Sequence, residues 1–221
     1  MPLTLNQRPA SLPPEILDEL PAQHPDAVAS RRDLRYFNSA LGNWSWFRRE
    51  IGRRMRANER ALELGAGTGE LGEILQNDGV AWDGIDRAPR PPNWATWARW
   101  HQGDIFDFDA WDTYPVVAGN LILHHFNEDQ LTQLGAALNR HARLIMIGDL
   151  RRGRWQQLSF FVYARWIGAN HVSLHDGSLS VRAGFRGQEL PEQLGLNRRD
   201  WVIELPRGHV SAYRMIATRR S

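Results

Sequence analysis

The sequence contains no cysteine and no lysine, so all 27 of its basic side chains are arginines. Without cysteine the chain can form neither a disulfide nor a thiolate metal site. Arginine stays charged at any working pH, and the basic surface therefore cannot lose its charge by titration. The net charge is only +2, which is too small for a general nucleic-acid binder, and we expect no nucleic-acid partner.

Long apolar runs are absent as well. No stretch approaches the ~20 residues that a membrane-spanning helix needs, so we expect no membrane span. The first residues, Met1–Asn6, lack the basic flank and apolar core of a signal peptide, and a cytoplasmic location is the expectation. The 221 residues are 42% hydrophobic and 24% charged, which is typical of one α/β domain with additions.

The densest pattern in the chain is Ala61–Gly72, a short apolar strand followed by a glycine-rich turn and a helix that begins near Glu70. Gly65, Gly67 and Gly69 allow positive φ angles and leave no side chain between the main chain and a ligand. Doubly wound folds use this order of strand, glycine turn and helix to bind nucleotide-like cofactors at the carboxyl ends of parallel strands. The stretch therefore predicts a cofactor site.

The acidic residues of this stretch indicate which cofactor. A dinucleotide fingerprint would have its third glycine where Glu70 stands, and a carboxylate there would repel a pyrophosphate. Glu63, on the strand, also suits a ligand with positive charge. The run resembles motif I of class I S-adenosyl-L-methionine (SAM) methyltransferases, Glu/Asp-x-Gly-x-Gly-x-Gly, at all four positions. The resemblance implies a Rossmann-like fold and SAM as cofactor, with S-adenosyl-L-homocysteine as product, and it places around the cofactor Glu63, Gly65, Ala66, Gly67 and Gly69.

Two further strand ends fit this cofactor. The strand Val80–Asp86 ends in an acid that can accept both ribose hydroxyls, and Arg87 would lie beside the adenine. A third strand, Arg99–Gln102, precedes Asp104 and Ile105. The stretch Gly103-Asp104-Ile105 resembles the family's adenine-binding motif, in which the acid accepts a hydrogen bond from the exocyclic amine and the next residue covers the adenine ring.

The second half of the chain completes the sheet. The apolar run Val116–Leu123 predicts a buried central strand with Asn120 at the rim of the site. A fifth strand over Arg143–Asp149 is followed by a segment that interrupts the alternation, with an aromatic helix (Trp155–Trp166) and a polar stretch that we interpret as a loop (His171–Ser180). Two last strands, 201–205 and 210–218, form a hairpin.

The predicted fold class is therefore α/β. We expect a doubly wound, seven-stranded, mostly parallel sheet with an antiparallel last strand. The N-terminal arm and helical cap would cover residues 1–57, and the SAM-binding domain residues 58–221. An insertion at about 151–195 would separate strands 5 and 6.

The N-terminal region begins with a proline-rich arm and a short helix around Glu15–Leu20. From Pro25 to about Asn58 the apolar residues step by three or four, and Gly42-Asn43 breaks the segment into two helices. Its arginines either form a solvated face or meet an acidic substrate. Five residues are candidates for the roof of an acceptor pocket: Tyr36, Asn38, Asn43, Trp44 and Trp46.

Histidine is the best candidate for a base that would assist transfer to a hydroxyl, since its ordinary pKa lies near neutrality. His124 and His125 follow the fourth strand on the cofactor side, and either could face the acceptor. His171 and His175 in the insertion are the next candidates for contact with the substrate. With Asp176 they could hold a metal ion only if the stretch were helical, and we expect a loop and no metal.

A metal-dependent mechanism is disfavoured for a second reason. Catechol-type methyltransferases resemble this fold but need acids at the ends of strands 4 and 5 for magnesium. Here the positions hold Asn120 and Asp149, with Leu150 where a further oxygen ligand would be expected.

The sequence thus predicts a SAM-dependent methyltransferase that acts on a small-molecule acceptor, a hydroxyl or phenol of an apolar or aromatic metabolite. Three alternatives stay open. One is an NAD(P)-dependent reductase on a related fold, although the chain has no lysine for a Tyr-x-x-x-Lys pair. Another is a protein that binds SAM without transferring the methyl group. The third is methylation of a nucleic acid, which the arginine-rich N-terminal cap suggests and which salt-dependent binding to RNA would support. The oligomeric state and the identity of the acceptor do not follow from the sequence.

Overall fold

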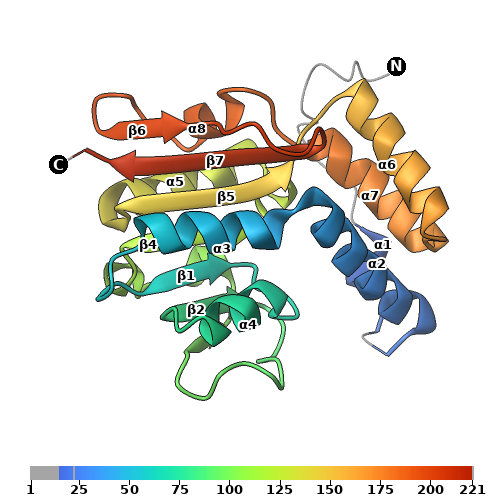
Figure 1. Cartoon of the computed structure of the whole chain (residues 1–221), viewed down its shortest axis with the longest axis horizontal. Coiled ribbons are helices and arrows are strands. Elements are labelled where there is room, and N and C mark those ends of the chain that lie inside the picture. Colours follow the sequence, from blue (N-terminus) through green and yellow to red (C-terminus); the bar gives the residue numbers. More distant parts are fainter. Residues whose placement is uncertain (1–14, 22, 221) are drawn as a thin grey trace.

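The computed structural model of the chain describes residues 15–21 and 23–220. These residues form one sheet with helices on both faces (Figure 1). The strands are β1 (Ala61–Leu64), β2 (Trp82–Asp86), β3 (Trp100–Gln102), β4 (Val116–Asn120), β5 (Leu144–Leu150), β6 (Trp201–Glu204) and β7 (Ala212–Arg219). The helices are α1 (Ile16–Glu19), α2 (Pro25–Leu41), α3 (Asn43–Arg54), α4 (Glu70–Asn77), α5 (Glu128–His141), α6 (Arg154–Trp166), α7 (His171–Ala183) and α8 (Glu189–Gln193). Three short 3₁₀ helices cover Ile105–Asp107, Trp111–Thr113 and Leu123–His125.

The strand order is β3-β2-β1-β4-β5-β7-β6, and the first five strands of the chain are parallel. β7 runs antiparallel to both of its neighbours. The predicted seven-stranded sheet with an antiparallel last strand is therefore confirmed. Its order reverses between β1 and β4, and a doubly wound sheet binds its ligand in the crevice at that reversal.

Each face of the sheet buries its own apolar layer. On one face α3 and α4 pack through residues that include Phe47, Ile51 and Leu75. On the other face α5 and α8 pack through residues that include Leu134 and Leu190. α3 thus packs on the sheet itself, and the division into a cap over residues 1–57 and a SAM-binding domain over residues 58–221 stays a prediction.

The remaining helices gather beyond the carboxyl ends of the parallel strands, where α1, α2, α6 and α7 form one group (Figure 1). The break between α2 and α3 falls at Gly42, whose φ of 66° is the left-handed conformation that glycine adopts without strain. The proline-rich arm ahead of Glu15 lies outside the described residues. The predicted short helix after it is present as α1.

Two local predictions are wrong. The polar stretch His171–Ser180 is helical rather than a loop, because Asn170 accepts the N–H of Ser173 and so caps the start of α7. The fourth strand ends at Asn120 instead of Leu123, because Leu121 turns the chain with a φ of 56°. This turn leads directly into the 3₁₀ helix that carries the two candidate histidines.

Replacing Gly135 with alanine is expected to lower the free energy of unfolding by about 1–3 kcal/mol, because the new methyl group would overlap the backbone carbonyl of Leu194. Gly52 is the matched control, a helical glycine on α3 whose added methyl group would have no neighbour within 4 Å. Gly52→Ala should raise stability by about 0.5–1 kcal/mol through its better helix propensity. Urea denaturation midpoints of the two variants measure the difference, and equal midpoints would contradict the tight contact between α5 and the Leu194 turn.

No helix within residues 15–21 and 23–220 combines the length and the apolar character that crossing a membrane requires.

Candidate active site

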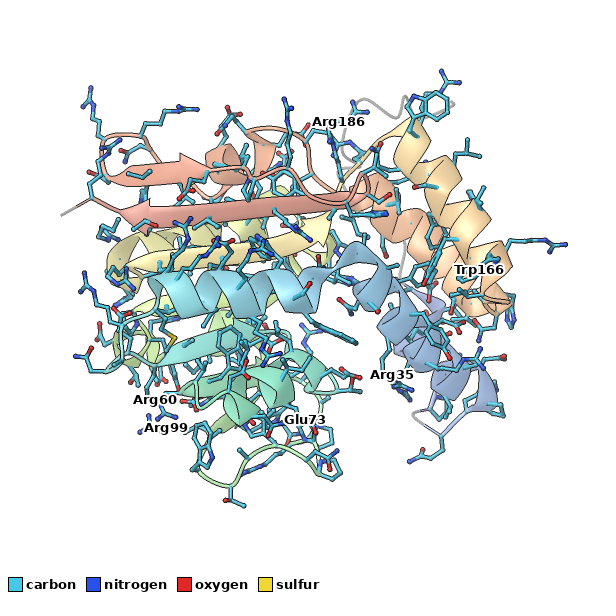
Figure 2. The ribbon with its side chains drawn as sticks, viewed as in Figure 1. Arg35, Arg60, Glu73, Arg99, Trp166 and Arg186 are labelled. Carbon is cyan, nitrogen blue, oxygen red and sulfur yellow. The ribbon has the colours of Figure 1, made fainter. Side chains whose placement is uncertain are left out.

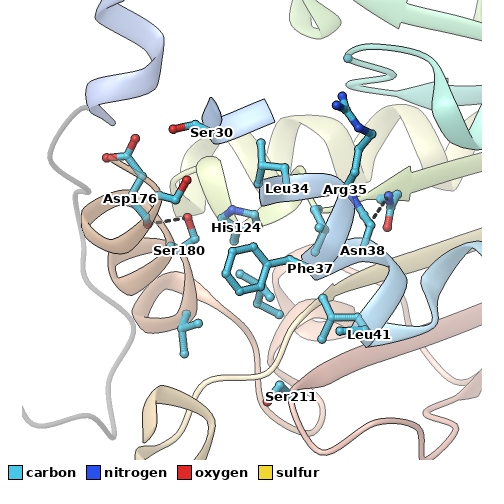
Figure 3. Close-up of a pocket in the computed structure, with 18 of the residues that line it drawn as sticks. Ser30, Leu34, Arg35, Phe37, Asn38, Leu41, His124, Asp176, Ser180 and Ser211 are labelled. Carbon is cyan, nitrogen blue, oxygen red and sulfur yellow. Dashed lines mark hydrogen bonds between the residues drawn. The ribbon is translucent and has the colours of Figure 1, made fainter. Parts of the chain in front are cut away.

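A cavity of about 500 Å³ lies between the carboxyl ends of β1 and β4 and the group of helices beyond them (Figure 3). Its floor is the glycine-rich loop with Glu63, Gly65, Ala66 and Gly67. Its walls come from α1, α2, α3, α6 and α7 and from the turn that follows β4. The cavity thus occupies the crevice where the strand order reverses.

Asp86, the acid at the end of β2, fixes the backbone of the glycine loop. Asp86 accepts the N–H of Gly67 at 2.7 Å through one carboxylate oxygen and the N–H of Ala88 at 2.8 Å through the other. Gly65, Gly67 and Gly69 all have positive φ, as predicted for a tight turn. Asp86 therefore reaches the loop from the strand end that the sequence indicated.

Glu63 is almost fully buried at the floor of the cavity, and the indole N–H of Trp82 donates to its carboxylate at 2.7 Å. Burial raises the pKa of Glu63 to about 8, and the nearby carboxylates of Glu70 and Asp86 act in the same direction. An acid with a pKa of about 8 is mostly protonated at pH 7, and a cation beside it would favour its charged form.

The residues predicted around the adenine lie together at the ends of β2 and β3. Arg87 donates to Asp104 at 2.5 Å, and the other oxygen of Asp104 accepts the N–H of Phe106, which caps the 3₁₀ helix containing Ile105. The Phe106 N–H and the Arg87 guanidinium hold the pKa of Asp104 below its ordinary value. Asp83, three residues before Asp86 on β2, is instead buried in contact with Arg60, which gives it a structural role.

The turn after β4 carries a buried histidine paired with an acid. Nδ1 of His124 lies 2.7 Å from Oδ1 of Asp149 at the end of β5. Burial alone would raise the pKa of Asp149, but the charge and hydrogen bond of His124 and the Leu150 N–H together hold it below its ordinary value. The other oxygen of Asp149 accepts the N–H groups of Leu123 and His124. The carboxylate therefore fixes both the backbone of the turn and the orientation of the His124 ring.

This pairing also places a proton on the His124 ring. Because an ionised carboxylate can only accept, Nδ1 of His124 carries a proton in this pair. His124 lines the cavity (Figure 3). The sequence had singled out His124 but not Asp149 as its partner.

His125 also lines the cavity, and its ring lies against that of His124 at a tilt of 34°, with ring centroids 4.2 Å apart. Desolvation of the ring is the first cause, and the neighbouring His124 the second, of its lowered pKa, although 32% of the His125 side chain stays exposed. Nδ1 of His125 lies 3.8 Å from the carboxylate of Glu15, ahead of α1. Glu15, His124 and His125 place possible metal-ligating atoms within 4.8 Å of one another. The metal site considered in the sequence, on His171, His175 and Asp176, is a different one.

Three asparagines connect the cap to the rim of the sheet. The side chain of Asn120 accepts from Asn43 at 2.9 Å and donates to Asn38 at 3.0 Å. Arg35 of α2 also lies 3.7 Å from Glu70 at the start of α4. These contacts hold α2 and α3 over the glycine loop. Asn38 and Asn43, which form them, are two of the five residues predicted for the roof of the acceptor pocket.

The outer wall of the cavity is apolar and aromatic. Phe37 of α2 stacks on Phe160 of α6 at 5.2 Å between ring centroids and meets Tyr163 edge-on at 5.4 Å. All three side chains line the cavity, together with Trp44 from the start of α3. This part of the cavity suits an acceptor with an aromatic or apolar body.

Five of the predicted substrate residues are not among the residues that line this cavity: Tyr36, Asn43, Trp46, His171 and His175. Trp46 is buried against the sheet because it lies on the face of α3 opposite to Trp44. Tyr36 points outward and is 47% exposed. His171 and His175 lie on the exposed side of α7, and the residues of that helix at the cavity are Asp176, Gly177, Ser180 and their neighbours.

Hydrogen bonds that the sequence did not indicate also join the start of α1 to α7 beside the cavity. The N–H groups of Ile16 and Leu17 donate to the carboxylate of Asp176 at 3.0 and 2.9 Å. The Ser180 hydroxyl donates to Glu15. α1 is therefore fastened to α7 across the cavity, and no local pattern in the sequence could pair segments 160 residues apart.

No protein-family model matches the chain, and no curated protein matches its sequence. Solved structures match it over most of its length. The plantazolicin methyltransferase BpumL in complex with SAH is 15% identical, with a TM-score of 0.63 over 90% of this chain and 92% of that chain. The plantazolicin methyltransferase BamL is 8% identical, with a TM-score of 0.66 over 93% of each chain.

A third similar structure is the pyocyanin biosynthetic protein PhzM, which is 20% identical, with a TM-score of 0.58 over 90% of this chain and 60% of that chain. These similarities show that the chain has the fold of class I SAM-dependent methyltransferases. The fold that motif I implied is therefore confirmed.

Proposed function

We propose that this protein is a SAM-dependent methyltransferase that transfers the methyl group to a hydroxyl or phenol of an apolar or aromatic small molecule. The observation that carries the proposal is a single cavity with the motif I loop on one side and the His124–Asp149 pair on the other. BpumL and BamL were solved with SAH, which supports the same cofactor here.

The cofactor would lie along the glycine loop. Glu63 would face the positively charged methionine end, Asp86 the ribose hydroxyls, and Asp104 the adenine amine. Methyl transfer is an in-line displacement at an already activated methyl group, so it depends chiefly on proximity and alignment. Residues lining the cavity, Phe37, Phe160 and Tyr163 among them, would enclose the acceptor and exclude water.

The His124–Asp149 pair favours a hydroxyl acceptor. A hydroxyl must lose its proton as the methyl group is transferred, and His124, oriented by Asp149, can take it. Asp149 would act as a positioning residue, since its carboxylate contacts His124 and the backbone rather than the acceptor.

The direct test is incubation with SAM and a panel of phenols, alcohols and amines, followed by quantification of SAH and of methylated product. Product from a phenol or an alcohol is the expected result. A parallel titration with SAM and with NADH separates the proposal from a reductase, and SAM binding without SAH formation across the panel would indicate a non-catalytic SAM-binding protein. Methylation of amines alone would assign a different acceptor atom.

Glu63 gives a prediction about SAM binding itself. Because its pKa is raised to about 8, the carboxyl group holds a proton near pH 7, and the cationic cofactor should drive that proton off. Calorimetry at pH 7 in buffers of different ionisation enthalpy should show release of about one proton per SAM bound. Glu63→Gln, which can keep the Trp82 hydrogen bond, should bind SAM more weakly and release no proton.

Glu63 should also make the free energy of unfolding of the cofactor-free protein depend on pH. Between the ordinary pKa of 4.5 and the folded-state value of about 8, the folded protein keeps a proton that the unfolded chain has lost. The Glu63 contribution to stability therefore falls as the pH rises through this window. Glu63→Gln should remove this part of the slope in urea denaturation series, and a slope identical to that of the wild type would argue against the raised pKa.

Chelation separates the proposed base from a metal site on the same side chains. We expect SAH formation to survive dialysis against EDTA, because His124 is assigned to proton transfer and not to metal ligation. Loss of activity that returns with a divalent cation would contradict this assignment and would favour a metal site on Glu15, His124 and His125.

A further inference from the structure

The outer face of α6 is unusually apolar for a helix in contact with solvent. Five large apolar side chains of this helix are exposed, more than on any other described element. Trp155 and Trp166, near its two ends, are 75% and 79% exposed, and Figure 2 shows Trp166 at the outer end of α6, away from the sheet. We define the outer face of α6 by its exposed residues, Arg154, Trp155, Leu158, Phe161, Val162, Arg165 and Trp166.

These side chains fall on one side of the helix. At 3.6 residues per turn all seven lie within an arc of about 140°. Leu158, Val162, Trp155 and Trp166 follow one another across most of this arc, and the two arginines lie beside Leu158. The sequence of α6 contains no aspartate or glutamate, so the charge of the outer face is positive only.

The opposite side of α6 already has its packing partners. Phe160 and Ala164 are buried against Val181 of α7, and Phe160 and Tyr163 line the cavity. The outer face therefore contributes nothing to the packing of the fold. An exposed apolar patch of this kind on a positively charged helix marks a surface for a partner.

The charges favour an anionic lipid surface over a second copy of the chain. Two copies of α6 that packed antiparallel about a twofold axis would bring Arg154 of one next to Arg165 of the other, with no acid on either helix to offset the repulsion. At a bilayer the same arginines would meet phosphate groups, and tryptophan is favoured at the boundary between headgroups and acyl chains.

We propose that the outer face of α6 docks the protein on an anionic lipid surface, with the helix axis parallel to the membrane plane. The apolar side chains enter the headgroup region, and Arg154 and Arg165 bind the lipid phosphates. Docking places the inner face of the same helix, and with it one wall of the cavity, close to the lipid. The proposal goes beyond the methyltransferase activity and does not depend on it.

Co-sedimentation with vesicles tests the proposal without any assay of activity. The wild-type chain should sediment with vesicles of phosphatidylglycerol and phosphatidylcholine in equal parts and should bind pure phosphatidylcholine far less. The double variant W155S/W166S should lose binding by about tenfold or more, because two large apolar side chains no longer enter the interface. W97S is the matched control, since Trp97 is 52% exposed on a loop far from α6 in the sequence, and it should bind like the wild type.

The arginines provide a second, independent readout. R154Q/R165Q should weaken binding to the anionic vesicles and make it less sensitive to salt, whereas R53Q, on the exposed part of α3, should do neither. Binding of W155S/W166S equal to that of the wild type would overturn the proposal. It would equally be overturned if the wild type ignored anionic vesicles, or if it formed a dimer in solution that the tryptophan substitutions dissociated.

Discussion

His124→Ala is expected to reduce the rate of SAH formation by about 10²–10⁴-fold, the range by which a positioned general base accelerates transfer to a hydroxyl. The dissociation constant for SAM should change little, because the ring reaches the cavity from the turn after β4 and the cofactor would lie along the glycine loop. Steady-state kinetics together with calorimetric titration of SAM separate the two quantities. A rate near that of the wild type would remove His124 from the mechanism.

The chain offers a matched control for this substitution. His141 and Asp112 form a second histidine–aspartate pair, 2.6 Å apart, on the surface near the end of α5. His141→Ala should leave turnover unchanged. If both variants lost activity equally, the loss would reflect a general effect on folding rather than the chemistry of the cavity.

The partner acid and the second histidine refine the same test. Asp149→Asn should lower turnover, because the ring of His124 would lose the carboxylate that orients it. Its melting temperature must be measured in parallel, since Asp149 also accepts backbone N–H groups. His125→Ala should depress turnover with little effect on SAM affinity, and full activity would exclude His125 from the mechanism.

Gly67→Val is expected to weaken SAM binding by at least about a hundredfold, equivalent to about 2.7 kcal/mol. A Cβ at this position would have only the Gly65 carbonyl oxygen as a neighbour, at 4.0 Å, so the new side chain would project into the space proposed for the cofactor. Isothermal titration with SAM measures the effect directly. Retained affinity would show that the cofactor does not pass over this part of the loop.

The positive φ of Gly67, 56°, adds a cost in stability for any other residue, which must be separated from the loss of binding. Gly79 is suited to this purpose, because its φ is 80° and an added Cβ would meet nothing within 4 Å. Gly79→Val carries a comparable backbone strain on the surface and should bind SAM normally. Gly65→Ala would instead collide with Ile122 and disturb the fold of the loop.

The sequence predicted those features that depend on local chemistry. The glycine loop, the acid at the end of β2 and the break at Gly42 each follow from what a few neighbouring residues can do, and the structure has all three. The antiparallel hairpin at the end was also predictable, because two apolar runs flank a turn-forming segment. Apolar spacing was enough to place α5 and α6.

Features that depend on distant partners were not predictable. The side chains that α7 buries include Ser173, Asp176 and Ser180. They form hydrogen bonds with α2, with α1 and with Glu15 ahead of α1, respectively. An apolar pattern could not reveal a helix that buries polar groups. The pairing of His124 with Asp149 joins residues 25 positions apart and depends on β4 and β5 being neighbours in the sheet. The sequence could not distinguish Trp44 from Trp46, because only the orientation of α3 decides that Trp44 lines the cavity and Trp46 packs on the sheet.

Because the indole N–H of Trp82 donates a hydrogen bond to Glu63, its NMR signal should report whether the proposed cofactor site is occupied. The indole proton points at a carboxylate whose charge should change when a cationic nucleoside arrives, so its resonance frequency in a ¹⁵N-resolved spectrum should move with occupancy. The Trp82 side chain is fully buried, which shields this signal from changes elsewhere on the surface. Ligands could therefore be ranked by NMR titration before any acceptor is known.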